Sequence, residues 1–428
     1  MSIEKLYDIY LKYPQVQTDT RKISKGEIFF ALKGPNFNGN QFAKQALEMG
    51  AALVVADEET GVTDERIFKV NDALEALQQL ALHHRRQFDI PFIAITGSNG
   101  KTTTKELVHA VLSAKYKTYT TQGNLNNHIG IPLTMLAIRK DAEMAVIEMG
   151  ANHQKEIESY CKIVLPTHGI ITNCGKAHLE GFGGVEGVRK GKGELYDFLR
   201  ASNGTAFVMW DYDYLREMSR GIHKIITYGT SGADHTGQAL QSEPFLEVQL
   251  EGNGSKRINT QLVGDYNLPN ILVAVTVGRY FSVNEQDIIA AIENYSPTNS
   301  RSQMVQKGSN KVILDAYNAN PTSMRAAIEN FARQHHDKKM ICIGGMMELG
   351  EESLAEHAEI VSLLQQFSWQ DVVLVGGDFA NVPHPFRFFA SSVEAAGWLK
   401  TNPVDQALVL VKGSRSMQME KIMDAFQQ

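Results

Sequence analysis

The 428-residue sequence has few cysteines, no excess of basic charge and no long apolar run. Its three cysteines (Cys161, Cys174 and Cys342) show neither a pairing pattern nor zinc-site spacing, which argues against a disulfide or zinc scaffold and favours a reducing cytosol. No apolar run reaches the roughly 18 residues of a membrane span, and Met1-Ser2-Ile3-Glu4-Lys5 does not begin a secretory leader. The net charge of −6 argues against a nucleic-acid partner. We therefore expect a cytoplasmic protein that neither spans a membrane nor binds nucleic acid.

What the sequence does contain is typical of a multidomain globular protein. Its hydrophobic content of 43% and charged content of 21% are ordinary for folded domains. A length of 428 residues favours about three domains of ~150 residues each. We place the boundaries so that the domains cover residues 1–88, 89–297 and 298–428. No internal repeat, low-complexity tract or coiled-coil pattern interrupts them.

Hydrophobic periodicity predicts an α/β fold in all three blocks. Strands are expected at Ile28–Leu32, Ala52–Ala56, Ile67–Val70, Phe92–Thr96, Met144–Glu148, Gly169–Asn173, Ala206–Met209, Val312–Asp315, Met340–Gly344, Val372–Val375 and Ala407–Val411. Other expected features are helices at Gln41–Met49, Ala73–Phe88 and Leu268–Phe281, a hairpin of Phe245–Leu250 and Arg257–Val263 around Glu251-Gly252-Asn253-Gly254, and a linker at Ser296-Pro297-Thr298-Asn299-Ser300. The alternation in the second block predicts a mostly parallel sheet with crossover helices.

The most informative segment follows the first strand of the second block. Gly97-Ser98-Asn99-Gly100-Lys101-Thr102-Thr103 connects an apolar strand to an amphipathic helix, which is the arrangement that cradles a polyphosphate. Backbone N–H groups at the two glycines can approach phosphate oxygens. Lys101 can neutralise phosphate charge and the Thr102 hydroxyl can bind Mg²⁺. An ordinary glycine turn is the alternative, but Gly, Gly, Lys and Thr in register favour a nucleotide site.

Three further residues occur where parallel strands end or shortly beyond. Glu148 ends a strand and can hold Mg²⁺ directly or through water, although such a residue is often only a solvated cap. His178 follows another strand across a short loop, and a single histidine is more often structural than a ligand. Lys192 lies in Arg189-Lys190-Gly191-Lys192-Gly193-Glu194, which by composition is a solvated basic helix face.

Together these segments resemble the Mur ligase family, the ATP-dependent ligases of the peptidoglycan precursor. The resembling segments are Thr-Gly-Ser-Asn-Gly-Lys-Thr-Thr (96–103), Gly-Asn-Leu-Asn-Asn-His-Ile-Gly-Ile-Pro (123–132), Glu-Met-Gly-Ala-Asn-His (148–153), Thr-Asn-Cys-Gly-Lys-Ala-His-Leu-Glu (172–180), Lys-Gly-Lys-Gly-Glu-Leu-Tyr (190–196), Asp-Ala-Tyr-Asn-Ala-Asn-Pro-Thr-Ser-Met (315–324) and Lys-Gly-Ser-Arg (412–415). Glu-Met-Gly-Ala and Tyr-Asn-Ala-Asn-Pro are most similar to the MurF branch. The Asp-Asn-Pro-Arg signature of the ligase that adds the third residue is absent.

The resemblance implies a three-domain ligase that acts in the cytoplasm as a monomer. The small N-terminal α/β domain would hold the UDP end of the substrate, the central P-loop ATPase-like sheet would hold ATP, and a Rossmann-like C-terminal domain would close over both. The implied reaction joins D-alanyl-D-alanine to UDP-N-acetylmuramoyl-tripeptide through an acyl phosphate, with release of ADP and phosphate. Phosphorylation is needed because a free carboxylate has no acceptable leaving group.

The resemblance also implies two Mg²⁺ sites. Thr102 and Glu148 would bind one ion, and His178 with Lys192 the second. In the family the lysine at the position of Lys192 is carbamylated, which turns a cation that would repel magnesium into an oxygen ligand. Lys101, Lys192, His178 and Asn127 would be the catalytic residues.

The remaining assignments are carried over by position. Asn267 and Asn270 would contact adenine, Arg301 and Asp315 the phosphate and ribose side of the nucleotide, and Asn124, Asn126, Asn320, Lys412, Ser414, Arg415, Thr20, Arg21 and Asn38 the substrates. Two positions depart from the family pattern. Tyr266 stands where the adenine motif usually has His, and Asn40 where the uridine-end segment more often has His. Both contacts are therefore less secure, and the uridine-end segment can also be read as simple surface turns.

Three alternatives stay open at this point: a related amide ligase such as a folylpolyglutamate synthase or a neighbouring Mur ligase, a nucleotide-binding regulator, and a metal-independent phosphotransferase. Tyr317–Pro321 argues against the first, and the presence of Glu148, His178 and Lys192 argues against the second. The residue that accepts the amine proton is not identified. His153 and His357 are candidates, although a surface or structural role is expected for each. The third residue of the peptide and the use of D-alanyl-D-lactate also stay open.

Overall fold

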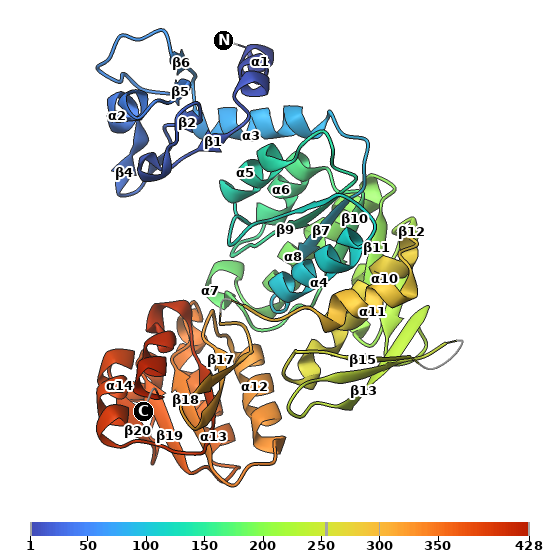
Figure 1. Cartoon of the computed structure of the whole chain (residues 1–428), viewed down its shortest axis with the longest axis vertical. Coiled ribbons are helices and arrows are strands. Elements are labelled where there is room, and N and C mark those ends of the chain that lie inside the picture. The colour runs from blue at the N-terminus through green and yellow to red at the C-terminus, as the bar shows by residue number, and fades with distance from the viewer. Residues whose placement is uncertain (1, 253–255, 299, 427–428) are drawn as a thin grey trace.

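The structure is a computed structural model that describes residues 2–252, 256–298 and 300–426 (Figure 1). Within this part of the chain, three main sheets follow one another along the sequence, over residues 16–69, 92–259 and 303–412. Helices cover each sheet, so the α/β class is confirmed. Asn253 and Gly254 of the expected hairpin turn and Asn299 of the expected linker lie outside the described residues.

The N-terminal domain is built on a small parallel sheet of order β1-β2-β5-β6. Its strands are β1 (Val16–Gln17), β2 (Ile28–Phe30), β5 (Leu53–Ala56) and β6 (Ile67–Lys69), with a short hairpin of β3 (Lys33–Gly34) and β4 (Phe37–Asn38). Its helices are α1 (Ile3–Lys12), α2 (Ala43–Glu48) and α3 (Ala73–Arg85). Buried β-branched and aromatic residues form β2 and β5, which is why these short strands occupy the middle of the sheet.

Helices α1 and α3 attach this domain to the central one through buried polar contacts. The Tyr10 hydroxyl donates to the Leu136 carbonyl at 2.6 Å. His84 Nε2 donates to the Ile138 carbonyl at 2.9 Å, while its Nδ1 accepts from the Tyr7 hydroxyl at 3.0 Å. Burial lowers the pKa of His84, so the neutral ring fits this pattern of one donor and one acceptor. The junction is therefore an ordered, desolvated contact.

The central domain has a sheet of order β15-β14-β13-β12-β11-β10-β7-β9-β8, parallel from β8 to β13 and antiparallel at β14 and β15. The strands are β7 (Phe92–Thr96), β8 (Thr118–Thr120), β9 (Met144–Glu148), β10 (His168–Ile171), β11 (Thr205–Met209), β12 (Lys224–Gly229), β13 (His235–Gln241), β14 (Glu247–Leu250) and β15 (Lys256–Asn259). The helices are α4 (Lys101–Ser113), α5 (Gly130–Ala137), α6 (Glu156–Val164), α7 (Leu179–Phe182), α8 (Val185–Ala201), α9 (Asp213–Met218), α10 (Leu268–Tyr280) and α11 (Glu285–Glu293).

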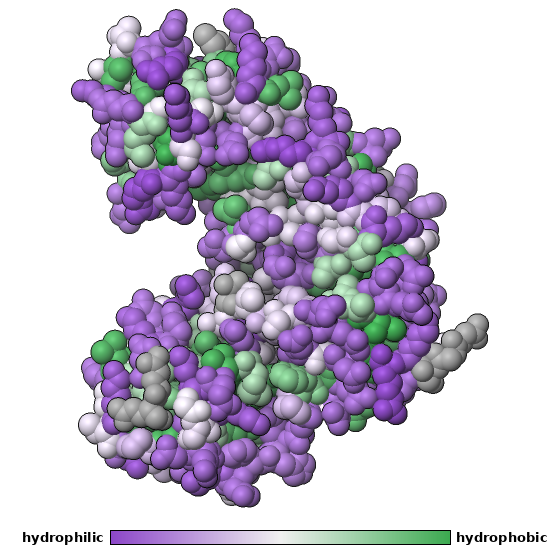
Figure 2. Space-filling view, viewed as in Figure 1, coloured by the Kyte–Doolittle hydropathy of each residue, from purple (hydrophilic) through white to green (hydrophobic). Residues whose placement is uncertain are grey.

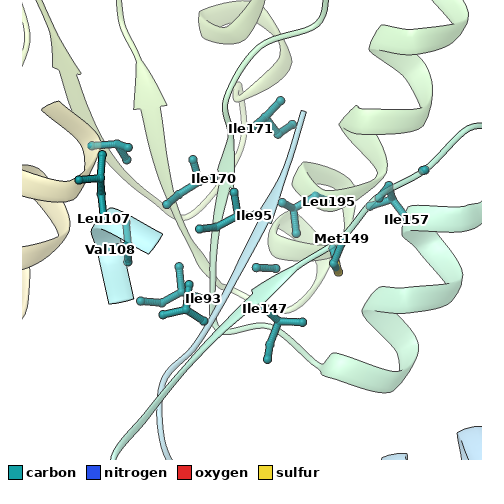
Figure 3. Close-up of a cluster of buried hydrophobic side chains, with 14 of the residues drawn as sticks. Ile93, Ile95, Leu107, Val108, Ile147, Met149, Ile157, Ile170, Ile171 and Leu195 are labelled. Atoms are coloured by element: carbon teal, nitrogen blue, oxygen red, sulfur yellow. The ribbon is translucent and has the colours of Figure 1, made fainter. Parts of the chain in front are cut away.

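The core of this domain lies on both faces of β7. Leu107 and Val108 of α4 pack on one side of the strand, and Ile157 of α6 and Leu195 of α8 on the other (Figure 3). Because both faces are covered, β7 is a continuous apolar run instead of an alternating one. This packing fixes the carboxyl ends of β7, β9 and β10 at one edge of the sheet, where open α/β folds place their ligands.

The C-terminal domain has a sheet of order β16-β17-β21-β18-β19-β20, in which the β16–β17 pair is antiparallel and the others are parallel. Its strands are β16 (Gln303–Lys307), β17 (Asn310–Asp315), β18 (Lys339–Gly344), β19 (Asp371–Val375), β20 (Arg387–Phe389) and β21 (Leu408–Lys412). Its helices are α12 (Pro321–Arg333), α13 (Ser353–Leu364) and α14 (Ser392–Thr401), followed by a 3₁₀ segment over Met419–Phe426.

The three domains form an open arch. The N-terminal and C-terminal domains project from the two ends of the central domain toward the same side (Figure 1), and Figure 2 shows a wide hollow between them. Within the described residues, we find no helix with the length and apolar character needed to cross a membrane.

Most of the expected strands and helices are observed, with shifted ends. Helix α2 begins later than expected because a 3₁₀ turn, Gly39–Phe42, precedes it, and α3 ends at Arg85 instead of Phe88. The hairpin pairs β14 with β15 in antiparallel register, but its strands are shorter than expected. The strands that were not expected are β1, β3, β4, β8, β12, β13, β16 and β20. Several of their positions are exposed and polar, so they lack the apolar run that marks a central strand.

Candidate active site

A cavity of about 1000 Å³ lies between the central and C-terminal domains. Of the predicted site residues, its wall contains Ser98, Asn99, Gly100, Lys101, Thr102, Thr103, Asn126, Asn127, Glu148, His178, Asn267, Asn270, Arg301, Asp315, Asn320 and Lys412. The other predicted site residues lie outside this wall in the described chain, and they are Gly97, Asn124, Lys192, Ser414, Arg415, Thr20, Arg21 and Asn38. The structure therefore brings the predicted nucleotide residues together and leaves the predicted uridine-end residues elsewhere.

The phosphate loop connects β7 to α4 and needs glycine for steric reasons. Gly97 has φ +143°, and a Cβ there would lie 2.0 Å from Oγ1 of Thr172. Gly100 has φ +77°, and a Cβ there would lie 2.6 Å from Oδ1 of Asn270. Both are left-handed conformations that L side chains rarely adopt. The loop therefore brings bare backbone to the N-terminus of α4, where an anion is stabilised.

Lys101 begins α4, and its side chain folds back over the loop. Its Nζ donates to the carbonyls of Gly97 at 2.7 Å and Ser98 at 3.2 Å. Burial lowers the pKa of Lys101, nearby Glu148 opposes that shift, and Arg301 adds to it. The amine lies beside the loop, where it can reach a bound phosphate by exchanging one of these carbonyl contacts.

Glu148 at the end of β9 fits a divalent cation. It is 2% exposed, and its Oε1 accepts a hydrogen bond from Nδ2 of Asn126 at 2.7 Å. Its Oε2 is buried without a hydrogen-bond partner in the described structure. A buried carboxylate oxygen that no donor satisfies is costly unless a cation or water completes it. With the Thr102 hydroxyl in the same wall, the donor set suits Mg²⁺.

The asparagine segment after β8 has mixed roles. Asn126 positions the Glu148 carboxylate instead of presenting a free amide. Asn127 lines the cavity, but its Oδ1 accepts from the backbone N–H groups of Ile129 at 3.2 Å and Gly130 at 2.9 Å, which caps the start of α5. Its amide nitrogen is the part that can face a ligand.

His178 and Lys192 lie in different surroundings. His178 is in the cavity wall, and its Nδ1 donates to Oε2 of Glu348 at 2.5 Å. Lys192 is 1% exposed on α8, where its Nζ donates to the Ala151 carbonyl at 2.9 Å and lies 4.9 Å from the centre of the Phe182 ring. Burial, assisted by the positive charge of Lys101, lowers the pKa of Lys192 well below its ordinary value. The interpretation of Lys192 as part of a solvated basic face is therefore wrong.

The predicted adenine residues hold α10 against the phosphate loop. Asn270 Nδ2 donates to Oδ1 of Asn267 at 2.9 Å, and the Thr104 hydroxyl donates to Oδ1 of Asn270 at 3.0 Å. Tyr266, which replaces the usual His, forms a hydrogen bond of 3.0 Å between its hydroxyl and that of Ser302 in the C-terminal domain. Both asparagines and Tyr266 line the cavity, and their polar atoms are largely engaged within the protein.

The C-terminal domain adds charged groups to the same cavity. The Arg301 guanidinium stacks 3.6 Å from the centre of the Tyr317 ring. Lys412 is buried, and its Nζ lies 2.5 Å from Oδ2 of Asp315. The Ser302 N–H donates to the other carboxylate oxygen of Asp315 at 3.1 Å. These contacts fix the carboxylate and the guanidinium at the edge of the cavity.

Ser414 and Arg415 follow β21 just beyond the cavity wall. The Ser414 hydroxyl accepts from the Met347 N–H at 3.1 Å and donates to the Ala319 carbonyl at 3.3 Å, so it is a buried structural group here. Arg415 is exposed, and its guanidinium lies 5.7 Å from the centre of the Tyr317 ring. Arg415 is therefore the more accessible of the two for a substrate.

The predicted uridine-end residues lie in the N-terminal domain, outside the cavity wall. Arg21 forms a bidentate pair with Asp19, at 2.9 and 2.8 Å. Asn38 Nδ2 donates to Glu58 at 2.6 Å. Asn40 is buried, and its Nδ2 donates to Oδ1 of Asn38 at 3.0 Å. Thr20 begins the 3₁₀ turn that also contains Arg21. The two segments are therefore hydrogen-bonded turns, and Arg21 is exposed.

Of the two histidine candidates for the amine proton, His357 is structural. It is fully buried, its Nε2 accepts from the Met346 N–H at 3.0 Å, and its Nδ1 donates to the Ser353 carbonyl at 2.7 Å. Both nitrogens are used, and burial lowers its pKa. His153 is exposed, 3.9 Å from Glu156, and neither histidine is in the cavity wall.

Several residues of the cavity wall were not predicted. Asp211, Tyr212 and Tyr214 follow β11 and face the same space, and Asn173 follows β10 and accepts from the Asn99 N–H at 3.0 Å. The signal for these four residues was their position in or shortly after the predicted strands Gly169–Asn173 and Ala206–Met209, because the loops after parallel strands meet at one edge of a sheet. Glu348, which contacts His178 but is not part of this wall, was not predicted either, although it follows the predicted strand Met340–Gly344 by a few residues.

Asn320 connects the C-terminal domain to the phosphate loop. Its Oδ1 accepts from the Ser323 N–H at 2.9 Å in a capping box that begins α12, and its Nδ2 donates to Oδ1 of Asn99 at 2.7 Å.

We expect Asn320→Ala to lose about 1 kcal/mol of stability with the cap. Asn320→Asp keeps the cap but places a negative charge beside the loop, and a repulsion near 1 kcal/mol should raise KM for ATP roughly fivefold. Thermal unfolding and ATP titration check both, and an unchanged KM in the Asp variant would contradict this assignment.

Comparison with known proteins gives matches along the whole chain. Residues 12–88 match the Mur ligase family catalytic domain, residues 95–278 the Mur ligase middle domain, and residues 300–415 the Mur ligase glutamate ligase domain. The UDP-N-acetylmuramoyl-tripeptide–D-alanyl-D-alanine ligase of Bacillus subtilis is 33% identical over 420 residues, which cover 95% of this chain and 92% of that protein.

Solved structures agree with the sequence matches. MurF from Acinetobacter baumannii superposes with a TM-score of 0.86 at 33% identity, covering 97% of this chain and 93% of that one. The MurF ligase of Thermotoga maritima in complex with ADP gives a TM-score of 0.87 at 27% identity, covering 97% of this chain and 98% of that one. The three-domain architecture is thus shared from end to end.

Proposed function

The chain belongs to the Mur ligase family, and from that premise we propose that it is the ligase that joins D-alanyl-D-alanine to UDP-N-acetylmuramoyl-tripeptide. It is an ATP-dependent ligase of peptidoglycan synthesis, and the domain boundaries lie near residues 88 and 297. The observation that carries this function is the 2.7 Å hydrogen bond between Asn320, in the Tyr-Asn-Ala-Asn-Pro segment, and Asn99 of the phosphate loop. It brings the segment most similar to the MurF branch directly to the nucleotide site. We also propose that the protein works as a monomer in the cytoplasm.

The chemistry begins with the ATP γ-phosphoryl group. Its transfer to the terminal carboxylate of the tripeptide breaks the β–γ phosphoanhydride bond and forms an acyl phosphate. The amine of D-alanyl-D-alanine then attacks the acyl carbon, an amide forms, and phosphate leaves. Backbone N–H groups of the phosphate loop and Lys101 hold the polyphosphate. The N-terminus of α4 stabilises its negative charge.

Magnesium would be held at two places in this site. Glu148, through its unpartnered Oε2, and Thr102 would hold one ion, and His178 with Lys192 the other. Bound there, the ions supply neutralising charge during phosphoryl transfer. Asn126 orients the first carboxylate through its bond to Oε1 and leaves Oε2 without a hydrogen-bond partner.

Lys192 would hold metal only after carbamylation. A neutral lysine amine attacks the carbon of CO₂, an N–C bond forms, and one proton leaves the nitrogen to give a carbamate anion. Burial and the charge of Lys101 favour the neutral amine, as their effect on the pKa of Lys192 indicates. The carbamate would need to turn away from the Ala151 carbonyl, toward the cavity.

The reaction itself is the first test. Purified protein should release ADP and phosphate only when Mg²⁺, UDP-N-acetylmuramoyl-tripeptide and D-alanyl-D-alanine are all present, because the acyl phosphate needs both its carboxylate and its amine. Coupled ADP assays over a matrix of UDP-muramoyl peptides, single amino acids and D-dipeptides measure this. The same matrix shows whether the third peptide residue is meso-diaminopimelate or L-lysine and whether D-alanyl-D-lactate is accepted. Robust turnover with a single amino acid and none with the dipeptide would overturn the assignment.

A further inference from the structure

Two side chains 170 positions apart meet where the C-terminal domain touches the central domain. His178 lies in the loop before α7, and Glu348 in the loop after β18. Nδ1 of His178 donates to Oε2 of Glu348 at 2.5 Å, with the imidazole 19% and the carboxylate 50% exposed. Figure 1 shows α7 reaching from the central domain toward the C-terminal domain at this point.

The backbone is arranged around this contact. His178 has φ +53° and Glu348 has φ +62°, left-handed conformations that are uncommon for residues other than glycine. The Glu180 N–H donates to the Glu348 carbonyl at 3.3 Å. Gly350, with φ +56°, lets the loop pass so close to α7 that a Cβ on Gly350 would lie 3.3 Å from Cβ of Glu180. Two strained residues held by backbone contacts indicate that the pairing is a built feature, since such conformations persist only where their surroundings impose them.

The hydrogen bond determines which nitrogen of His178 can bind a ligand. A carboxylate on Nδ1 keeps the proton on that atom, so the lone pair lies on Nε2. Within the described part of the chain, Nε2 of His178 accepts no hydrogen bond, and the ring lines the cavity. Histidines that ligate metals commonly donate their other ring N–H to a carboxylate, which fixes the tautomer and the ring orientation.

We propose that Glu348 is a positioning residue that orients the His178 imidazole so that Nε2 faces the second metal. This inference rests on the two-metal site proposed above. Because Glu348 belongs to the C-terminal domain, the second metal site is complete only when that domain is docked on α7. Metal binding and domain docking then strengthen one another, since coupling between two binding events is reciprocal. The Lys176–Glu356 ion pair and the 3.0 Å bond from the Lys176 N–H to the Thr322 hydroxyl hold the same docked arrangement.

The test uses the full-length protein with ADP and Mn²⁺, whose binding is counted by electron paramagnetic resonance. Wild-type protein should bind two Mn²⁺ ions. In Glu348→Gln, which keeps the shape of the side chain but loses its charge, the His178 site should lose about 10- to 100-fold in affinity while the Glu148 site is unchanged. Glu351→Gln, an exposed neighbour on the same loop, should behave as wild type. Nitrogen-15 spectra of labelled histidine should show the Nδ1–H tautomer of His178 in wild type and its loss in Glu348→Gln.

The possible results distinguish a failure of the proposed role of Glu348 from a failure of the proposed two-metal site. Two Mn²⁺ ions with unchanged affinity and tautomer in Glu348→Gln would overturn the role of Glu348 and leave the two-metal site standing. Tighter binding in that variant would also overturn it, because the carboxylate would then be competing with the metal for the imidazole. Only one Mn²⁺ ion in wild type would overturn the two-metal site itself, and the inference with it.

Discussion

Replacing Lys101 with alanine is expected to reduce the rate of ADP release on the order of 10³-fold. The Nζ atom lies beside the phosphate loop, hydrogen-bonded to the carbonyls of Gly97 and Ser98, within reach of a bound polyphosphate. Its loss removes the cation that neutralises charge in the transition state. The loop should keep its shape, because the glycine conformations and the Thr172 and Asn173 contacts do not depend on this lysine. Steady-state kinetics and circular dichroism measure the two effects.

The matched control is Lys140→Ala, which removes an exposed lysine of the same domain. It should leave both turnover and the spectrum at wild-type values. Near-normal activity in Lys101→Ala would mean that the loop does not hold the nucleotide phosphates. A collapsed spectrum would show instead that the lysine is needed for folding, and a second variant, Lys101→Met, would then be used to measure turnover alone.

Lys192→Arg is expected to abolish most activity for a different reason. Arginine keeps a long, positively charged side chain but does not form the carbamate, so the second metal loses an anionic ligand. Binding of ATP near Thr102 and Glu148 should be partly retained. Turnover, Mn²⁺ stoichiometry and the signal of ¹³C-labelled carbamate after exchange with labelled bicarbonate should fall together in this variant.

Lys190→Arg, an exposed position on the same helix, serves as the control and should be neutral. Because Lys192 is fully buried, a bulkier guanidinium can disturb packing. Lys192→Met, which suits the buried position, should fold well and be equally inactive. Full activity of either variant, or a wild-type protein with no carbamate signal at saturating bicarbonate and Mg²⁺, would refute the carbamylated lysine.

The local parts of the site could be predicted from the sequence. The phosphate loop has a fixed spacing of glycines, lysine and threonine, and the strand before it is apolar because both its faces are covered. Glu148 could be predicted because the end of a parallel strand is where such sheets place their ligands. In each case, neighbouring residues along the chain determine the geometry.

What depends on contacts between domains could not be predicted. The pairing of His178 with Glu348 joins residues far apart in sequence, and no pattern in either segment predicts that the two side chains meet. Asn320 was expected at a substrate and does line the cavity, but its hydrogen bond to Asn99 could not be predicted, because the sequence does not show that the start of α12 meets the phosphate loop. Within the central domain, Lys192 could not be recognised as buried either, since the sequence around it is rich in charge and glycine.

The junction between the first two domains has a consequence for substrate length. Tyr10 and His84 attach the N-terminal domain to the backbone of the central one through buried hydrogen bonds, whereas the C-terminal domain contacts α7 and the loop before it through partly exposed ion pairs. Buried, satisfied polar contacts are rigid, and exposed ones exchange easily with water. If the N-terminal domain holds the uridine end, the distance from that end to the phosphate loop is a fixed spacing. The first two domains would then select the length of the peptide. A muramoyl peptide with one residue too few would place its carboxylate short of the γ-phosphate. A peptide with one residue too many would place its carboxylate beyond it.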